Sequence, residues 1–244
     1  IVIGVYESSF LLTEKKKNTI LIMAGGKGTR LLPLTENVPK PMIEVGGKPI
    51  IERIIEKLLK EGFENIVLSL GHLSDVIENY ISNSEFKDNI SFLKEDKPLG
   101  TAGALSNIDI EKTNFPILVT NGDILCECNL SSVLEKAERD NYDGIMLCKE
   151  EKFIFPFGVV QCKDQQWLGI KEKPTFQYKV NAGIYVLSEK IIKLVNKNDF
   201  LDMPKLFEIA KNNKLKLGIE CTNQYWIDIG RHETLNSANN YFQS

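Results

Sequence analysis

Two basic residues stand close behind a cluster of glycines near the start of the chain. In the segment LIMAGGKGTRLLPLTENVPKP, an apolar run leads into Gly25, Gly26 and Gly28. Glycine can adopt positive φ and bring its N–H group close to an anion, because no Cβ stands in the way. Arg30 adds a fork of donors, and Lys40 is a point charge held between two prolines. This pattern predicts a backbone cradle for the phosphates of a nucleotide.

Two familiar glycine motifs do not account for this loop. A P-loop requires G-x-x-x-x-G-K-[ST], and no such string follows Gly25. A dinucleotide fingerprint requires a third glycine at the position where Leu31 stands, counting from Gly26. A plain strand-to-loop connection is the simpler alternative. It leaves unexplained Arg30, the Pro-Lys-Pro sequence and a second Gly-Gly-Lys-Pro turn that ends at Pro49.

Two aspartates from distant segments are candidates for a metal site. Asp123 follows a buried apolar strand, at the edge where α/β sheets bind ligands. Asp228 lies in the sequence Trp-Ile-Asp-Ile-Gly, and an acid between apolar neighbours is costly to bury unless it meets a cation. For either residue alone, a surface acid or a helix cap is the alternative. Together they predict an Mg²⁺ site that also takes phosphate oxygens.

Length, charge and cysteine content restrict the class of protein. The 244 residues suit one large α/β domain, and a net charge of −3 argues against nucleic acid as a partner. No apolar run approaches the ~20 residues that cross a membrane, so no membrane partner is expected. The five cysteines include Cys126 and Cys128, but no second pair or histidine cluster accompanies them, which disfavours zinc. We therefore expect free thiols in a reducing cytoplasm.

The elements that would position the glycines and the aspartates alternate between strand and helix in the first half of the chain. Strands are expected at 18–24, 65–70, 90–94 and 115–120, and helices at 49–61, 74–81 and 130–141. Ser74 is placed to cap the second of these helices. This alternation predicts an α/β, Rossmann-like fold with a mostly parallel central sheet and helices on both faces.

The second half of the chain has a mixed pattern without a domain boundary. Strands are expected at 145–148, 157–161, 168–172, 180–187 and 215–220, and helices at 189–195 and 203–212. We interpret this half as a mixed subregion on the acceptor side of one domain that spans 18–244. Residues 1–17 place an apolar run before the basic residues, the reverse of a signal peptide. They are expected to be the remnant of a preceding domain and its linker, or else a leader of no consequence.

The chain resembles the sugar-1-phosphate nucleotidyltransferases over residues 18–242. The motifs that carry the resemblance are, in order, the glycine segment with its Pro-Lys-Pro, PLGTAGAL from Pro98, NGD ending at Asp123, EKP from Glu172, VNAGIYV from Val180 and WIDIG ending at Gly230. The resemblance implies a nucleotidyltransferase type A fold. It also implies transfer of a nucleoside monophosphate from a nucleoside triphosphate to a sugar 1-phosphate, with release of pyrophosphate.

The resemblance assigns roles residue by residue. Arg30 would meet the β- and γ-phosphates, Lys40 would be a second phosphate contact, and Lys173 would grip the incoming sugar phosphate. The implied catalytic residues are Arg30, Lys40, Asp123, Lys173 and Asp228, with Mg²⁺ held by Asp123 and Asp228. The implied nucleotide-binding residues are Ala24, Gly25, Gly26, Gly28, Thr29, Arg30, Lys40, Glu95, Gly100, Thr101, Ala102 and Asp123. The implied sugar-phosphate-binding residues are Gly158, Glu172, Lys173 and Asn181. Neither His72 nor His232 lies in a matching motif, and both are interpreted as structural or exposed.

Glu95 favours GTP as the nucleotide. In thymidine- and uridine-using relatives a glutamine commonly stands about five residues before the equivalent of Gly100, where this chain has Glu95. A carboxylate only accepts hydrogen bonds, and guanine offers two adjacent donors. A solvated loop acid is the alternative interpretation of Glu95. The resemblance is nearest to guanylyltransferases linked to CBS domains, which implies glucosamine 1-phosphate as the first acceptor, mannose 1-phosphate as the second, and a role in legionaminic acid or surface glycan synthesis.

Several alternatives stay open. The chain could be a glucose-1-phosphate thymidylyl- or uridylyltransferase, a cytidylyltransferase acting on an alditol phosphate or an amino alcohol, or a nucleotide-sugar sensor or regulatory subunit without chemistry. The five candidate catalytic residues are all present, which argues against a sensor. The expected partners are small-molecule substrates, and the resemblance also allows an N-terminal CBS regulatory domain and a homo-oligomer.

Overall fold

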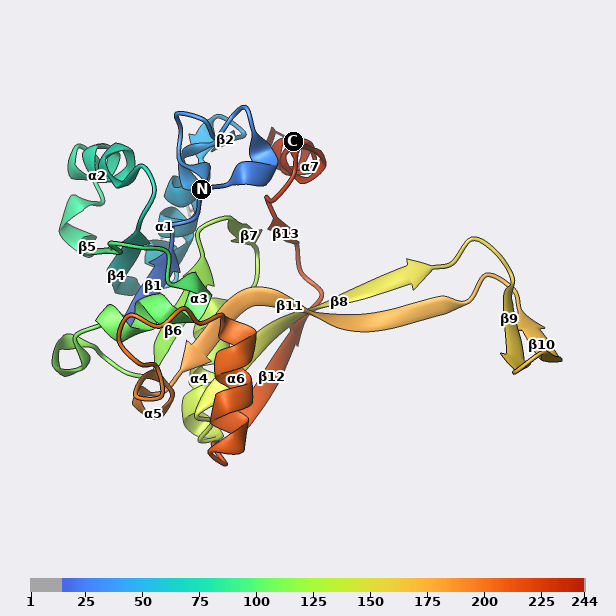
Figure 1. The fold of residues 1–244 in the computed structure, drawn as a ribbon. Helices are drawn as coiled ribbons and strands as arrows, with labels where there is room; N and C mark the ends of the chain where they lie inside the picture. Colours follow the sequence, from blue (N-terminus) through green and yellow to red (C-terminus); the bar gives the residue numbers. More distant parts are fainter. Residues whose placement is uncertain (1–14, 244) are drawn as a thin grey trace, which may run out of the picture.

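The strand β1 (Lys16–Met23) is an interior strand of a seven-stranded sheet in the computed structural model, which describes residues 15–243 (Figure 1). The strand order is β12-β8-β11-β6-β1-β4-β5. The remaining strands of the sheet are β4 (Phe63–Leu70), β5 (Ile90–Lys94), β6 (Ile117–Asn121), β8 (Gly144–Ile154), β11 (Thr175–Leu187) and β12 (Leu217–Thr222). β11 is antiparallel to both of its neighbours, and the other pairs are parallel. The predicted mostly parallel sheet is confirmed.

Alternate side chains of β1 face two separate apolar cores. Ile20 and Ile22 pack in one core, and Leu21 packs in the other. Successive residues of a strand point to opposite faces, so a continuous apolar run is what a sheet covered on both sides requires. The first core takes side chains from α1 (Ile50–Lys60), α2 (Ser74–Ser82), α4 (Leu130–Arg139) and α7 (His232–Gln243). The second takes them from α3 (Gly100–Gly103), α5 (Glu189–Ile192) and α6 (Met203–Asn212).

The first half of the chain follows the predicted elements within a few residues, with one correction. Ser74 does not cap α2. Leu73 precedes the helix with a φ of 56°, Ser74 is already its first residue, and the Ser74 hydroxyl donates to Asp75 Oδ1. The left-handed turn at Leu73 therefore takes the place of a side-chain cap.

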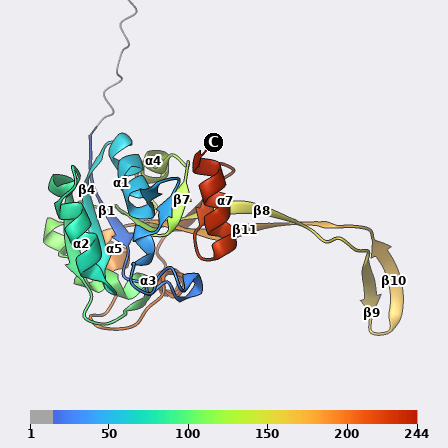
Figure 2. The ribbon, with the colours of Figure 1, turned by 90° about the horizontal axis from the view of Figure 1, so that it is seen from above.

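The second half departs more strongly from the predicted lengths. β8 and β11 are much longer than predicted and leave the sheet as a two-stranded ribbon, with β9 (Val159–Lys163) and β10 (Gln166–Lys171) at its far end. Figures 1 and 2 show this ribbon from two directions, and in both views it projects away from the rest of the molecule. The predicted helix at 189–195 is shortened to the single turn of α5.

Four short strands complete the fold. β7 (Ile124–Cys126) pairs antiparallel with β13 (Trp226–Asp228), and β2 (Glu44–Val45) pairs with β3 (Lys48–Pro49). All five cysteines lie among the described residues, and each is a free thiol. Across residues 15–243, no helix combines the length and apolar character needed to traverse a membrane. The predicted remnant of a preceding domain falls mainly on residues 1–14, outside the described part of the chain.

Candidate active site

The glycine loop follows β1 directly and is held in place by contacts with the side chains of Thr35 and Lys40. Gly28 has a φ of 64°, and a Cβ there would lie 3.0 Å from both Lys40 Cβ and Thr35 Cγ2. The buried Thr35 hydroxyl donates to Gly28 O at 2.9 Å. A larger residue at position 28 would therefore be strained and would also push Lys40 away. The glycines predicted to form the cradle thus lie against the predicted lysine.

Lys40 is a buried cation that joins the two predicted aspartates. Its side chain is 10% exposed, and its Nζ forms an ion pair with Asp123 Oδ2 and lies 3.9 Å from Asp228 Oδ1. The aspartates come together because β7 and β13 pair, with Asp228 opposite Ile124. Ile229 N also donates to Asp123 O at 2.9 Å. The structure therefore brings together three of the five predicted catalytic residues.

The two carboxylates are incompletely satisfied by the protein. Asp123 Oδ1 and Asp228 Oδ1 are buried, and neither has a hydrogen-bond partner in the described part of the chain. Burial and the neighbouring Asp123 charge raise the pKa of Asp228, while Lys40 and Arg30 act in the opposite direction. Carboxylate oxygens without a hydrogen-bond partner are the kind of ligand that a hard cation takes. Residues 15–243 contain no group of three or more His, Cys, Asp or Glu side chains placed so that they could hold a metal ion. A cation bound to Asp123 and Asp228 would therefore need further ligands, such as the oxygens of a bound phosphate.

Arg30 lies beside this group of charges, across Gly230. A Cβ added at Gly230 would be 3.1 Å from Arg30 Nη2 and 3.0 Å from Asp228 Oδ1. A cavity of about 250 Å³ opens at this point, and its lining is Gly26, Gly28, Thr29, Arg30, Lys40, Asp123 and Gly230. Two cations, exposed glycine backbone and a carboxylate face one space. That combination can bind a polyphosphate and neutralise charge that develops on it.

A second cavity lies on the other side of the glycine loop. It measures about 210 Å³, and its lining is Gly25, Lys27, Gly71, His72, Glu95, Asp96, Lys97 and Pro98. Gly71 lets β4 approach the loop, since a Cβ there would be 2.8 Å from Gly25 O. This cavity lies beside the one lined by Arg30 and Lys40, and its position suits the base of a nucleotide whose phosphates bind there. His72 is exposed, as predicted, but it also forms part of this wall, which the sequence analysis missed.

Glu95 is fixed within the second cavity by both of its carboxylate oxygens. The buried Ser69 hydroxyl donates to Oε1 at 2.7 Å, and Leu99 N donates to Oε2 at 3.3 Å. Each carboxylate oxygen can accept more than one hydrogen bond, so both keep capacity for a ligand. Glu95 is thus a positioned acceptor and not a freely solvated loop acid.

The loop at Gly100 to Ala102 is tied to its own chain. A Cβ at Gly100 would lie 2.6 Å from Leu201 O, Ala102 N donates to the same oxygen at 2.8 Å, and the Thr101 hydroxyl accepts from Met203 N at 2.9 Å. Close packing against Leu201 is enough to explain why these residues are small, and no ligand contact is needed for that explanation. None of the three residues lines the second cavity, so their contact with the nucleotide remains a prediction.

The predicted sugar-phosphate residues divide into two groups. Asn181 lies near the base of the ribbon, where its Nδ2 donates to Tyr185 Oη at 2.7 Å and its Oδ1 accepts from Gly183 N at 3.0 Å. Gly183 contacts the Asn121 side chain, next to Asp123. Gly158, Glu172 and Lys173 lie at the far end of the ribbon instead. A Cβ at Gly158 would be 2.7 Å from Glu172 Oε1, so Gly158 and Glu172 contact each other at a place remote from the aspartates.

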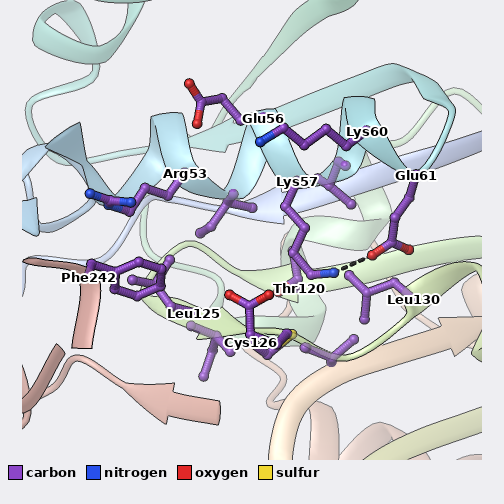
Figure 3. A pocket seen from close by; sticks show the side chains of 15 residues that line it. Arg53, Glu56, Lys57, Lys60, Glu61, Thr120, Leu125, Cys126, Leu130 and Phe242 are labelled. Carbon is purple, nitrogen blue, oxygen red and sulfur yellow. Dashed lines mark hydrogen bonds and ion pairs between the residues drawn. The ribbon is translucent and has the colours of Figure 1, made fainter. Parts of the chain in front are cut away.

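A further cavity of about 280 Å³ lies between α1, β7 and α7 (Figure 3). None of the predicted site residues lines it. Two of the three basic residues that line this cavity, Arg53 and Lys57, already have partners within the protein. Arg53 donates to Val45 O and Gly46 O and lies over the Phe242 ring, and Lys57 meets Glu61 and Cys128 O.

Three structural residues of the site escaped the sequence analysis. Thr35 braces the glycine loop, Ser69 orients Glu95, and Gly230 makes room for Arg30. Gly230 had a signal, because it ends the WIDIG motif. Thr35 also had a signal, because it lies in the glycine segment only seven residues after Gly28. Ser69 acts on Glu95 through a contact distant in sequence and had none.

The charge of Asp228 is expected to reduce the stability of the ligand-free protein. Because folding raises the pKa of this carboxyl, its ionised form at neutral pH opposes folding. Asp228→Asn should therefore raise the melting temperature at pH 7 by roughly 2 °C. Calorimetry of this variant beside Asp88→Asn, which changes an exposed acid, checks the effect. A lower melting temperature for Asp228→Asn would show that the carboxylate is well compensated.

Known proteins resemble this chain along most of its length. A mannose-1-phosphate guanyltransferase of Pichia angusta is 33% identical over 86% of the chain, and the bifunctional protein GlmU of Methanocaldococcus jannaschii is 36% identical over 91%. The alignments span 60% and 53% of those two proteins.

Solved structures share the fold. HddC of Yersinia pseudotuberculosis, crystallised in complex with GMP-PN, has a TM-score of 0.71 and 28% identity, with 92% of this chain and 99% of that one covered. A UDP-glucose pyrophosphorylase of Acinetobacter baumanii has a TM-score of 0.72 at 18% identity, covering 92% and 93% of the two chains, and so supports the fold alone. The model of the nucleotidyl transferase family matches residues 19–244. The chain belongs to the nucleotidyl transferase family.

Proposed function

We propose that this protein transfers a nucleoside monophosphate from a nucleoside triphosphate to a sugar 1-phosphate and releases pyrophosphate. The observation that carries the proposal is Lys40, buried between Asp123 and Asp228 beside the glycine loop. This arrangement suits charge neutralisation on a polyphosphate. It contains no nucleophile paired with a base.

The proposed reaction needs no general base. A sugar 1-phosphate is already an anion near neutral pH, and its oxygen attacks the α-phosphorus of the nucleotide. One P–O bond forms while the bond from the α-phosphorus to the bridging oxygen breaks, and the electron pair leaves with pyrophosphate. Arg30 and Lys40 line the cavity of about 250 Å³, where they can hold the triphosphate and offset the charge of the leaving group.

Mg²⁺ is the proposed cofactor, with Asp123 and Asp228 as its protein ligands. The free Oδ1 atom on each carboxylate fits this role. The ion would supply charge neutralisation at the phosphate oxygens, which would complete its coordination.

GTP is the proposed nucleotide. Glu95 presents both carboxylate oxygens in the cavity beside the glycine loop, held there by Ser69 and Leu99. Guanine can donate to such a pair through N1–H and its amino group, whereas uracil and thymine offer one donor next to acceptor oxygens. The relatives in whose names guanyltransferase appears, and HddC with its GMP-PN, agree with this choice.

Glucosamine 1-phosphate is the first acceptor that we propose, and mannose 1-phosphate is the second. The reaction would serve nucleotide-sugar synthesis for surface glycans or legionaminic acid. The free cysteines suit the reducing cytoplasm, which also supplies GTP.

Loss of either aspartate should abolish turnover without unfolding the protein. Asp123→Asn and Asp228→Asn should each lower kcat by at least about 100-fold, because the carboxylates act on charge at the reacting phosphates. Pyrophosphate release is measured with Mg²⁺ present, and far-UV circular dichroism monitors the fold. Asp88→Asn is the matched control. Near-normal rates in either variant would refute the proposed metal ligands.

A grid of four nucleoside triphosphates and several sugar 1-phosphates tests substrate choice. We expect GTP to give the highest kcat/KM. Glu95→Gln should reduce the preference for GTP by about 10-fold or more, since an amide cannot accept through both atoms. Asp96→Asn changes the neighbouring acid in the same cavity and should leave the preference intact. Preference for UTP or dTTP in the unmodified enzyme would contradict the role of Glu95. A GTP preference that survives Glu95→Gln would show that other residues select guanine.

A further inference from the structure

The projecting ribbon, here called the arm and comprising residues 150–179, is a long extension of two central strands. Pairing between β8 and β11 continues without a break from Lys149 and Val180 to Ile154 and Thr175. Lys149 still contacts the body, where its Nζ donates to Gln224 O at 3.0 Å. Beyond this point, the arm projects clear of the body in both views (Figures 1 and 2). The unbroken ladder keeps the far end of the arm away from the aspartates of its own chain.

The arm carries a large share of the exposed apolar side chains of the protein. Of the eighteen exposed large hydrophobic side chains in the described part of the chain, ten lie on the arm, among them Phe153, Ile154, Phe157, Val160, Trp167 and Leu168. Isolated two-stranded ribbons are marginally stable at best, and apolar patches of this kind mark interaction sites. With large side chains about half exposed, the arm presents roughly 1,000 Å² of apolar surface.

The area available favours a second copy of this chain as the partner. Two arms packed reciprocally across a two-fold axis would bury roughly 2,000 Å², which is the range of obligate homodimers. A symmetric contact uses the same surface on both subunits, so one apolar arm is sufficient to build it.

The residues carried by the arm give this contact a function. The body holds the triphosphate cavity and the aspartates but neither Glu172 nor Lys173, which are the predicted ligands of the incoming sugar phosphate. The catalytic centre of one chain is therefore incomplete without an arm. We infer that the arm packs on a second copy of this chain and supplies Gly158, Glu172 and Lys173 to the active site of that copy. This inference rests on the proposed nucleotidyl transfer.

Mixed dimers test whether the site is shared between subunits. Asp123→Asn damages the body and Lys173→Ala damages the arm, so each homodimer should be nearly inactive. Differently tagged variants are co-expressed, and the mixed dimer is isolated through both tags. In a shared arrangement the mixed dimer has one intact site, because the Asp123→Asn subunit lends its Lys173 to the other body. It should recover about half of the wild-type kcat per dimer.

Three outcomes would overturn the inference. Failure to isolate a mixed dimer would exclude the contact, and an inactive mixed dimer would show that each arm serves its own body. Lys173→Ala homodimers with normal kinetics for the sugar phosphate would show that the arm does not supply this residue. Absence of turnover in the wild-type protein would contradict the proposed function instead. In that case the molecular mass of the protein in solution decides whether the arm joins two copies of the chain.

Molecular mass tests the contact independently of activity. Phe157, on the arm, and Phe200, outside it, are both 68% exposed, so the same change can be made at each. By light scattering, the wild type and Phe200→Glu should be dimers and Phe157→Glu should be a monomer with unchanged circular dichroism. A monomeric wild type, or a dimer that persists in Phe157→Glu, would contradict arm-mediated assembly.

Discussion

The ion pair between Lys40 and Asp123, with Asp228 nearby, is the interaction on which the site depends. Three charges in a largely buried place are costly unless they compensate one another. Here compensation is partial, because Asp123 Oδ1 and Asp228 Oδ1 have no hydrogen-bond partner among the described residues, and Lys40 Nζ is as far as 3.9 Å from the second of them. The protein thus carries an unsatisfied electrostatic demand at the point where a metal-bound polyphosphate would fit.

Much of the surrounding fold can be understood as the support of that group. β7 and β13 pair so that Asp228 lies next to Asp123. Gly122 brings this turn against β1, with its N–H donating to Met23 O at 2.8 Å. The glycine loop then leaves β1 at the same edge and contacts Lys40 through Gly28. The carboxyl ends of the central strands therefore meet where the substrates would bind, as in other open α/β sheets.

Sequence patterns predicted those parts of the molecule whose signal is local. The apolar run of β1 and the helical periodicity of α1 are complete within their own segments, and the ends of both elements were predicted within two residues. The glycines, Lys40 and the two aspartates were also predicted, because their residue types and their motif resemblance agree. The pairing of β7 with β13, which brings Asp228 next to Asp123, was not predicted. β13 has only three residues, which is too short for a recognisable strand pattern.

Features that depend on distant contacts could not be predicted. Ser69 acts on Glu95 across neighbouring strands, and nothing close to Ser69 in the sequence indicates this. The left-handed turn at Leu73 replaced the expected Ser74 cap, although leucine rarely adopts that conformation. The arm was predicted as short separate strands, because its length arises from pairing between segments that have no helical or buried-strand pattern. The distance of Lys173 from the aspartates follows from that pairing.

Binding of Mn²⁺ as a spectroscopic substitute for Mg²⁺ tests the central claim most directly. The wild-type protein, Asp228→Asn and Asp123→Asn are titrated with Mn²⁺ by electron paramagnetic resonance, with and without a non-hydrolysable GTP analogue. If the two carboxylates hold a cation together with phosphate oxygens, the analogue should tighten Mn²⁺ binding to the wild type by about 10-fold or more and should have little effect in either variant. Equal Mn²⁺ affinities for all three proteins in the presence of the analogue would contradict the account.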